Sequence, residues 1–324
     1  MTSELPSYDE LPVTPGAPPG SSWGVWGEIG TDVLGCLNLL TPERVARAAS
    51  LVRRGRVFGL DLDATLPSPP LFGRPPFRHE VVGKIGGSHD DLLHDWNTQS
   101  SSQWDGFRHV AHPLYGHYGG VPDEEHGIQH WHGRIAGRCV LVDFGRWREA
   151  QGRPLAYDEP DPITPGELRA CVEDQATPIE AGDVVLLRTG WLSWYRTLDE
   201  SGRAAVARPD GFAAPGLRPG QDMLRLLWDL HIAAVAGDNP GVEVLPLGVF
   251  TDRSVAREDK TRWPDVFMHT ALLPLLGMPL GELFDLDELA EDCAATGTYE
   301  AFFTSSPLNM PQGVASPPGA VAIR

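Results

Sequence analysis

The residues best suited to chemistry gather in one stretch, residues 97–113 of the 324-residue chain, which reads NTQSSSQWDGFRHVAHP. The stretch has few aliphatic side chains and many groups that donate, accept or titrate. Such a composition favours neither a helix nor a core strand, so it is either a solvated loop or a functional segment held by a scaffold. Trp104 at its centre favours the functional segment, because a large aromatic side chain is an unusual choice for a solvated loop.

Four residues of this stretch are candidates for catalysis. An imidazole titrates near neutral pH, so His109 can transfer a proton; otherwise it is an ordinary surface residue. Asp105 either orients that imidazole, binds a donor of the substrate or caps a turn. Gln99 and Gln103 carry amide N–H groups that either stabilise an oxyanion or satisfy carbonyls of the loop. The three serines lack the Gly-x-Ser-x-Gly pattern of a nucleophile elbow, which disfavours a serine hydrolase.

The composition excludes several classes of function. The chain carries 44 acidic and 26 basic residues, and its net charge of −18 would repel phosphate backbones and anionic membranes. No apolar run approaches the roughly 20 residues needed to cross a bilayer, and the polar, Pro-rich start lacks the pattern of a secretory signal. The four widely spaced cysteines are typical of reduced thiols. We therefore expect a cytoplasmic protein that binds neither nucleic acid nor membranes.

Predicted strands and helices alternate along the rest of the chain. Capping residues and apolar periodicity predict helices that start at Thr41-Pro42 and Thr164-Pro165, and further helices over residues 221–230, 264–276 and 286–295. Short apolar runs predict strands over residues 57–62, 138–144, 184–188, 232–236 and 299–303, and a terminal edge strand. This alternation, without an internal repeat, predicts one α/β or α+β domain over residues 23–324, preceded by an extended N-terminal arm over residues 1–22.

Four short motifs follow one another along this domain: LNLLTP at 37–42, GRCVLVD at 137–143, GDNP at 237–240 and SPL at 306–308. Their order resembles the putative cyclase family, which includes the bacterial kynurenine formamidases and isatin hydrolases. The resemblance implies a mixed β-sheet core, partly barrel-like and flanked by helices. It also implies a homo-oligomer, a dimer or a tetramer, an expectation that the Trp-rich segments without an obvious core role support.

The catalytic signature of that family is His-x-x-x-His-x-Asp-x-x-x-His, in which the first two His and the Asp hold a divalent metal and the last His is the base. The same spacing in this chain falls on Gln99, Gln103, Asp105 and His109. The Asp and the base are therefore kept, whereas glutamine replaces both metal-binding histidines. The resemblance thus identifies a divergent branch of a metal-dependent family.

Two further metal ligands of the family, a His and a later Glu, fall on His269 and on Gly281, with Glu282 one residue away. An amide offers one neutral carbonyl oxygen, which suits Mg²⁺ or Ca²⁺ but is poor for Zn²⁺ or Mn²⁺. We therefore expect no tightly bound metal and no other cofactor. The alternative is a weakly bound divalent cation held by Asp105, His269 and Glu282.

Four residues are expected to contact a substrate: Trp104, His269, Asp238 and Tyr115. Trp104 is interpreted as a pocket wall or as part of a subunit interface, and with Tyr115 it would suit a flat, partly apolar ligand. Asp238 follows a buried strand, where sites of α/β proteins gather, although it also suits the cap of a turn. His269 is selected only by its position in the family.

The leading hypothesis is an enzyme that acts on a small carbonyl compound. His109 would activate water against an amide, lactam or lactone carbonyl, with the glutamine amides as oxyanion donors and with little or no metal dependence. A second version uses His109 to move a proton in a dehydration, isomerisation or ring closure. The third alternative is an inactive relative that binds a small molecule or a protein. Retention of Asp105 and His109 at the family spacing favours an enzyme.

Overall fold

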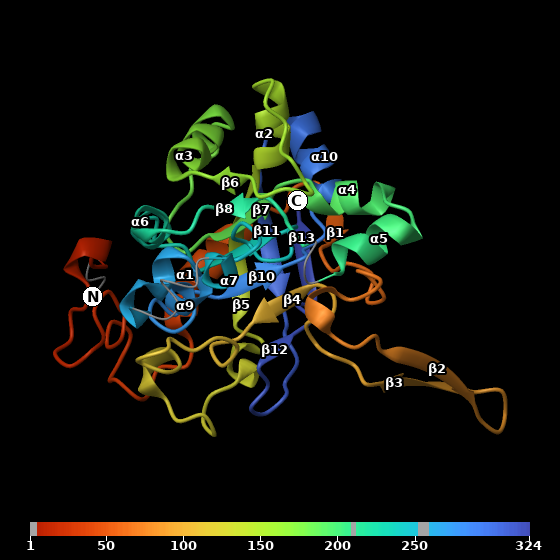
Figure 1. Cartoon of the computed structure of the whole chain (residues 1–324), viewed down its shortest axis with the longest axis horizontal. Helices are drawn as coiled ribbons and strands as arrows, with labels where there is room; N and C mark the ends of the chain where they lie inside the picture. Colours follow the sequence, from red (N-terminus) through yellow and green to blue (C-terminus); the bar gives the residue numbers. More distant parts are fainter. Residues whose placement is uncertain (1–4, 209–211, 252–258) are drawn as a thin grey trace.

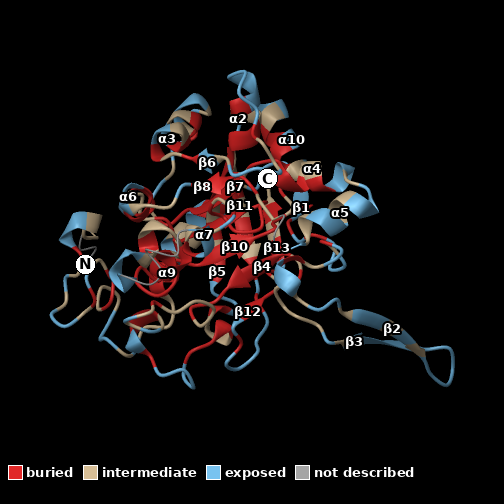
Figure 2. Ribbon diagram, in the orientation of Figure 1, coloured by how far each residue is buried: buried red, intermediate tan, exposed pale blue. Residues whose placement is uncertain are grey.

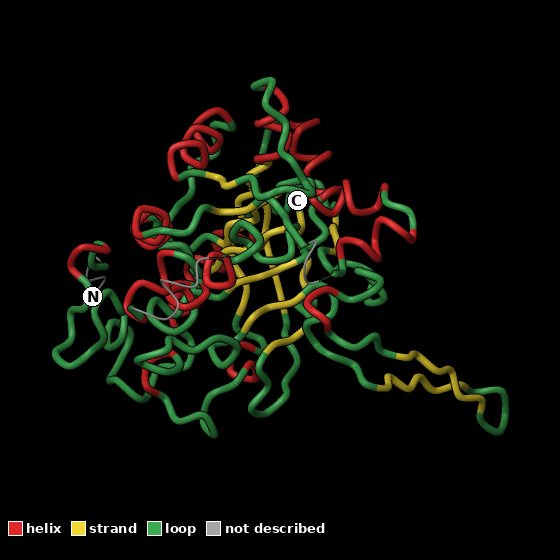
Figure 3. The backbone as a smooth tube through the Cα atoms, viewed as in Figure 1, coloured by secondary structure: helices red, strands yellow, loops and turns green. Residues whose placement is uncertain are grey.

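A curled sheet of nine strands forms the centre of the computed structural model, which describes residues 5–208, 212–251 and 259–324 (Figures 1 and 3). Its strands are β1 Val57–Gly59, β4 Gln103–Asp105, β5 Ile135–Asp143, β7 Val184–Arg188, β9 Ala234–Gly237, β10 Leu280–Glu282, β11 Glu300–Ser305, β12 Ala315–Ser316 and β13 Ala320–Ile323. They are ordered β1-β13-β11-β5-β7-β9-β10-β4-β12. The pairs within β5-β7-β9-β10 are parallel and all other pairs are antiparallel, so the sheet is mixed, as predicted.

The curl brings distant parts of the strand order together. Asp61, just past β1, forms a backbone bridge with Phe284, just past β10. Next to this bridge, Asp285 N donates to Leu60 O over 2.8 Å. The hydroxyl of Ser102, directly before β4, donates to the main-chain oxygen of the residue after β10. These links confirm the half-barrel that the resemblance implied, and they place β4 and β10 beside the start of the sheet.

Helices cover the sheet: α1 Pro42–Ala49, α2 Phe144–Ala150, α3 Pro165–Asp174, α4 Trp191–Thr197, α5 Glu200–Val206, α6 Gln221–Asp229, α7 Gly248–Thr251, α9 His269–Leu272 and α10 Asp287–Thr296. The predicted caps of α1 and α3 are confirmed. The Thr41 hydroxyl accepts from Arg44 N, and Thr164 and Glu167 form a reciprocal capping box. Two additional short strands, β6 Pro162–Ile163 and β8 Gly216–Leu217, pair in a separate parallel ladder.

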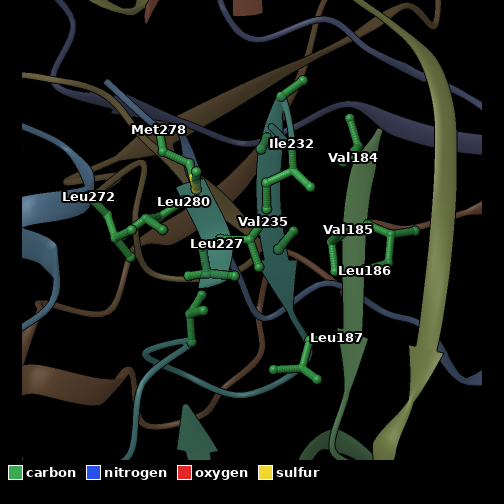
Figure 4. Close-up of a cluster of buried hydrophobic side chains, with 14 of the residues drawn as sticks. Val184, Val185, Leu186, Leu187, Leu227, Ile232, Val235, Leu272, Met278 and Leu280 are labelled. Atoms are coloured by element: carbon green, nitrogen blue, oxygen red, sulfur yellow. The ribbon is translucent and has the colours of Figure 1, made fainter. Parts of the chain in front are cut away.

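The central parallel strands β7 and β9 are almost entirely apolar, as expected of strands with both faces covered. Figure 4 shows Val185 and Leu187 of β7 and Val235 of β9 within one buried cluster. Leu227 of α6 and Leu272 of α9 belong to the same cluster. Each such side chain contributes roughly 1.5–3 kcal/mol when it is fully buried. This core rigidly supports the neighbouring strands β4 and β10, which carry polar side chains.

Two predicted elements differ from the structure. Residues 264–276 do not form one helix but a 3₁₀ turn at Lys260–Asp265 and the short helix α9. Pro274 favours the end of α9 after Leu272, because a proline has no main-chain N–H with which to continue the helical hydrogen bonds. The C-terminal strand β13 is not an edge strand, since it pairs with β1 on one side and β11 on the other. Its buried Ala320 and Ala322 are compatible with either position, so the pattern did not decide between them.

Two segments lie outside the sheet. Strands β2 Arg78–Gly83 and β3 His89–His94 form a hairpin that projects from the body and exposes Val81, Ile85 and Leu92 (Figures 1 and 2). The N-terminal segment contacts α6, where Tyr8 N donates to Asp229 over 2.7 Å. Within the described residues, no helix combines the length and the apolar character that a membrane span requires.

Candidate functional site

The candidate site is built on the antiparallel pair of β4 and β10. Glu282 lies opposite Gln103, and Leu280 lies opposite Asp105. Because side chains alternate along a strand, Gln103, Asp105 and Glu282 point to the same face of the sheet. The amide of Gln103 donates to Glu282 Oε2 over 2.5 Å. Gln103 and Glu282, which are far apart in the sequence, are therefore in direct contact at the site.

The same register corrects the position of the family's last ligand, which the alignment had placed on Gly281. Gly281 faces the opposite side of the sheet, paired with Trp104. A Cβ atom added to Gly281 would lie 2.5 Å from Ala236 Cβ and 2.6 Å from a ring carbon of Phe284, so only glycine fits. Glu282 is the carboxylate at the site.

His269 lies at the start of α9 and is held by a carboxylate that the sequence did not reveal. Its Nδ1–H donates to Glu243 Oε1 over 2.5 Å, and Glu243 also accepts from the main-chain nitrogens of Met268 and His269. This contact turns Nε2 of His269 toward Glu282 Oε1 at 3.2 Å and Asp105 Oδ2 at 3.7 Å. Glu243 thus plays the part of an outer carboxylate that fixes the orientation of an imidazole.

His109 follows β4 and lies closer to solvent than His269, with 25% of its side chain exposed against 6%. Its Nε2 is 3.8 Å from Asp105 Oδ2. The amide of Gln99 donates to Asp105 Oδ1 over 2.8 Å and lies 3.1 Å from His109 Nδ1. The structure therefore brings together all four predicted catalytic residues, with His269 and Glu282 beside them.

Burial and the neighbouring charges set the protonation of these groups. Burial lowers the pKa of His109, and Asp105 offsets this only in part, so the imidazole is neutral near pH 7. Burial opposes the charge on Asp105, but the imidazoles of His109 and His269 hold its pKa below the usual value. Burial and the charge on Asp105 raise the pKa of Glu282 to about 7. The carboxylates around His269 outweigh its burial and raise its pKa well above the usual value.

Three of these groups, His109, His269 and Glu282, line a cavity of about 190 Å³, and Asp105 is fully buried beside them. The polar side chains of the cavity are Arg74, His109, His269 and Glu282. The rest of the lining is largely apolar and comes from the segment before β2 and from the loops that follow β9: Phe72, Pro240, Gly241, Leu245, Leu247 and Phe267. The cavity therefore combines proton-carrying groups with an apolar wall, the arrangement typical of sites for small molecules.

The geometry also fits a divalent cation. Single ligand atoms of Asp105, His269 and Glu282 all lie within 4.8 Å of one another. Gln103 Oε1 and Asp105 Oδ2 are buried and have no hydrogen-bond partner among the described residues. Carboxylate and amide oxygens suit hard cations such as Mg²⁺ and Ca²⁺, whereas the loss of two imidazoles weakens a site for Zn²⁺. The donor set thus fits a hard cation better than a transition metal.

The structure places three predicted substrate-binding residues away from this cavity. Trp104 is fully buried on the opposite face of β4 and donates to the Ser305 hydroxyl over 2.9 Å. Asp238 caps a turn, where it accepts from the main-chain nitrogens of Thr189 and Gly190. Tyr115 stacks on a neighbouring imidazole and lines a different cavity. Of that group, only His269 lines the cavity of His109.

Sequence reasoning missed Glu243 and Arg74. Glu243 lies in the loop after the GDNP turn, and Arg74 lies in the Pro-rich segment before β2, for which the sequence predicts no element. Both approach the site from parts of the chain far from residues 97–113, so no local pattern identifies them. The sequence offered only a weak signal for Glu243, a charged residue close to the GDNP motif. For Arg74 it offered a charged residue within a Pro-rich segment.

Comparisons with known proteins agree with this architecture. The sequence profile of the putative cyclase family matches residues 60–244. A crystal structure described as a novel cyclase is 30% identical, with a TM-score of 0.76, over 94% of this chain and 99% of that chain. No curated protein sequence matches the chain.

Isatin hydrolases share the fold at lower identity. Isatin hydrolase A from Ralstonia solanacearum is 17% identical, with a TM-score of 0.56, over 83% of this chain and 92% of that chain. An isatin hydrolase bound to the product analogue thioisatinate is 16% identical, with a TM-score of 0.54, over 85% and 93% of the two chains.

Proposed function

Because the chain belongs to the putative cyclase family, we propose that this enzyme hydrolyses an amide, lactam or lactone bond of a small carbonyl compound, with His109 as the general base. The observation that carries the proposal is the cavity lined by His109, His269 and Glu282. The buried carboxylate of Asp105 lies within 4 Å of both imidazoles. His109 occupies the position of the family's catalytic base, and its Nε2 lies 3.8 Å from the buried carboxylate of Asp105. Both features suit it to proton transfer.

In the proposed reaction, a ring nitrogen of His109 takes a proton from water while the water oxygen bonds to the carbonyl carbon. The C–N or C–O bond then breaks, and the proton passes from the imidazolium to the leaving nitrogen or oxygen. Asp105, at 3.8 Å, stabilises the imidazolium between these two steps. The amide of Gln99 keeps Asp105 in place through its 2.8 Å hydrogen bond.

The hydrogen bonds of the glutamines favour a positioning role over the stabilisation of an oxyanion. The amide N–H groups of Gln99 and Gln103 are directed at Asp105 and Glu282, so they position carboxylates rather than face a substrate oxygen. We propose that catalysis does not depend on a tightly bound transition metal. When a hard divalent cation is bound, Asp105, Glu282 and Gln103 Oε1 would hold it, together with His269 once its Nε2 has lost its proton, and the cation would polarise the substrate carbonyl.

A second candidate is a proton transfer without water, such as a dehydration, isomerisation or ring closure. It is favoured by the presence of two proton-carrying groups, His109 and Glu282, in the lining of one cavity. In that reaction His109 would remove a proton from carbon or oxygen, and Glu282 would return one to the leaving group or to the product.

Substrate screening in isotopically labelled water separates these reactions. The enzyme is incubated in H₂¹⁸O with formamides, lactams, lactones and β-hydroxy carbonyl compounds. The masses of the products are then measured by mass spectrometry. Hydrolysis places ¹⁸O in the new carboxylate, whereas dehydration and isomerisation do not. Turnover without label supports the second candidate. A protein that binds such compounds and converts none of them contradicts both, and is then a binding protein.

A further inference from the structure

We propose that Arg74 binds a carboxylate carried by the substrate, so that the site selects small anionic carbonyl compounds with an apolar body. This inference rests on the proposed function for the identity of the reacting bond, but not for the recognition of the anion. Arg74 lines the same cavity as His109 and Glu282. It lies between the 3₁₀ turn Leu71–Gly73 and strand β2.

Two contacts fix the guanidinium of Arg74 in the cavity wall. Its Nη1 donates to the main-chain oxygen of Gln99, in the same loop that carries the site. Its planar group lies over the ring of Phe72, with the central carbon 5.0 Å from the ring centroid. A guanidinium that is stacked and anchored on one side loses little further freedom when it binds a ligand. The side chain is thus held in place before a ligand arrives.

Among the described residues, the other donors of the Arg74 guanidinium make no hydrogen bond, and no carboxylate lies within 4 Å of it. Its charge acts on Asp105 and Glu282 only at longer range. Arg188, which lines another cavity, differs in this respect because it is paired with both Asp143 and Asp287. A planar fork of free N–H groups matches the two oxygens of a carboxylate. An arginine that has no direct carboxylate partner among the described residues and lines a mostly apolar cavity therefore indicates an anionic ligand group.

The charges around the cavity also set the orientation of a bound ligand. The carboxylates of Asp105 and Glu282 lie together beside His269, so they disfavour the carboxylate of a ligand at that end of the cavity. An anionic substrate would direct its carboxylate to Arg74 and leave its carbonyl group near His109. Phe72, Leu245 and Phe267 would contact the apolar part between these ends.

The size of the cavity limits this apolar part. Its volume of about 190 Å³ is below the roughly 300–1,000 Å³ typical of sites for drug-sized ligands. The expected ligand is therefore a small carboxylic acid, for example one with a single ring. Its reacting carbonyl group would lie at the opposite end of the molecule from its carboxylate.

A binding experiment tests the inference without a known substrate. Isothermal titration calorimetry compares benzoate with its neutral isostere benzamide on the wild-type protein. We expect benzoate to bind roughly 10–100-fold more tightly, the range of a charge-assisted hydrogen-bonded pair. Arg74→Gln should remove this difference, and Arg74→Lys should keep a part of it, because lysine retains the charge without the fork.

A matched control is Arg78→Gln, which removes an exposed arginine of the hairpin that pairs with Glu80. It should leave the preference for benzoate unchanged. Equal binding of the two compounds by the wild type, or an unchanged preference in Arg74→Gln, would overturn the inference. Circular dichroism and the urea midpoint of each variant establish that it is folded, and Arg74→Lys replaces Arg74→Gln if the latter unfolds.

Kinetics separate this inference from the proposed function. For a substrate and its analogue with carboxamide in place of carboxylate, Arg74→Gln should raise KM for the anionic compound alone and leave kcat nearly unchanged. An equal fall in kcat for both compounds would place Arg74 at the reacting carbonyl and contradict the inference, while the enzyme assignment would stand. Selective binding of benzoate by a protein that turns over no substrate would contradict only the proposed function.

Discussion

Replacement of Glu243 by glutamine tests how the site holds His269. Glu243 is buried and accepts three hydrogen bonds, over 2.8 Å from Met268 N, 3.2 Å from His269 N and 2.5 Å from His269 Nδ1. Glutamine keeps one acceptor oxygen and places an NH₂ group where the second oxygen accepted. One buried donor is then unsatisfied, and the contact between opposite charges is lost. Hydrogen bonds to charged groups contribute about 1.5–3 kcal/mol, so we expect a loss of about 2–4 kcal/mol in the free energy of unfolding.

The assay is urea unfolding at pH 7, with Glu180→Gln as the matched control. Glu180 is half exposed and pairs with the exposed Arg47 and with Arg138, which keeps Asp183 and Glu300 as partners, so its replacement should cost at most about 1 kcal/mol. If Glu243→Gln were as stable as this control, the buried contact with His269 would not exist in the protein, and the orientation inferred for His269 would be wrong.

Three further predictions concern the metal, the assembly and the pH dependence of stability. Protein purified without chelator should carry well below one Zn or Mn per chain in elemental analysis, because amides stand where two imidazoles would be needed; one equivalent of either would contradict this. Light scattering should give at least twice the chain mass of 35.3 kDa, and deletion of the exposed hairpin β2–β3 should weaken the assembly; a wild-type mass of one chain would contradict it. Burial lowers the pKa of His126 from 6.5 to about 4, so the unfolded chain binds more protons between these values and stability falls as the pH drops through this range. From this group alone we expect a loss of about 2 kcal/mol between pH 7 and pH 5, and His126→Gln should flatten the slope by that amount; an unchanged slope would contradict the burial of a neutral His126.

The sequence predicted those parts of the fold that local signals determine. Thr164-Pro165 with Glu167 predicted the start of α3, because a capping box needs only residues that are close in the chain. The apolar run at the start of residues 184–188 predicted β7, because a strand with both faces covered carries a continuous run of apolar residues. The hairpin β2–β3 escaped prediction because charged and apolar side chains are mixed on both of its faces.

The site was predictable only where it lies in one segment. Gln99, Gln103, Asp105 and His109 lie in one polar stretch, and their spacing matches the signature of the family that the chain resembles. The choice between Gly281 and Glu282 required the register of β10 on β4, since a shift of one residue turns a side chain to the other face. Glu243 and Arg74 reach the site through tertiary packing and could not be found by spacing.

The measurement that tests the central claim most directly is the turnover number of His109→Ala with a substrate from the screen. If His109 is the proton-transfer group, kcat should fall roughly 10²–10⁴-fold, the range for a general base. Asp105→Asn should lower kcat by an intermediate amount, and Gln103→Ala by less. Circular dichroism and unfolding curves establish that each variant is folded. Turnover by His109→Ala at the wild-type rate would contradict the assignment of residues 97–113 as the active site.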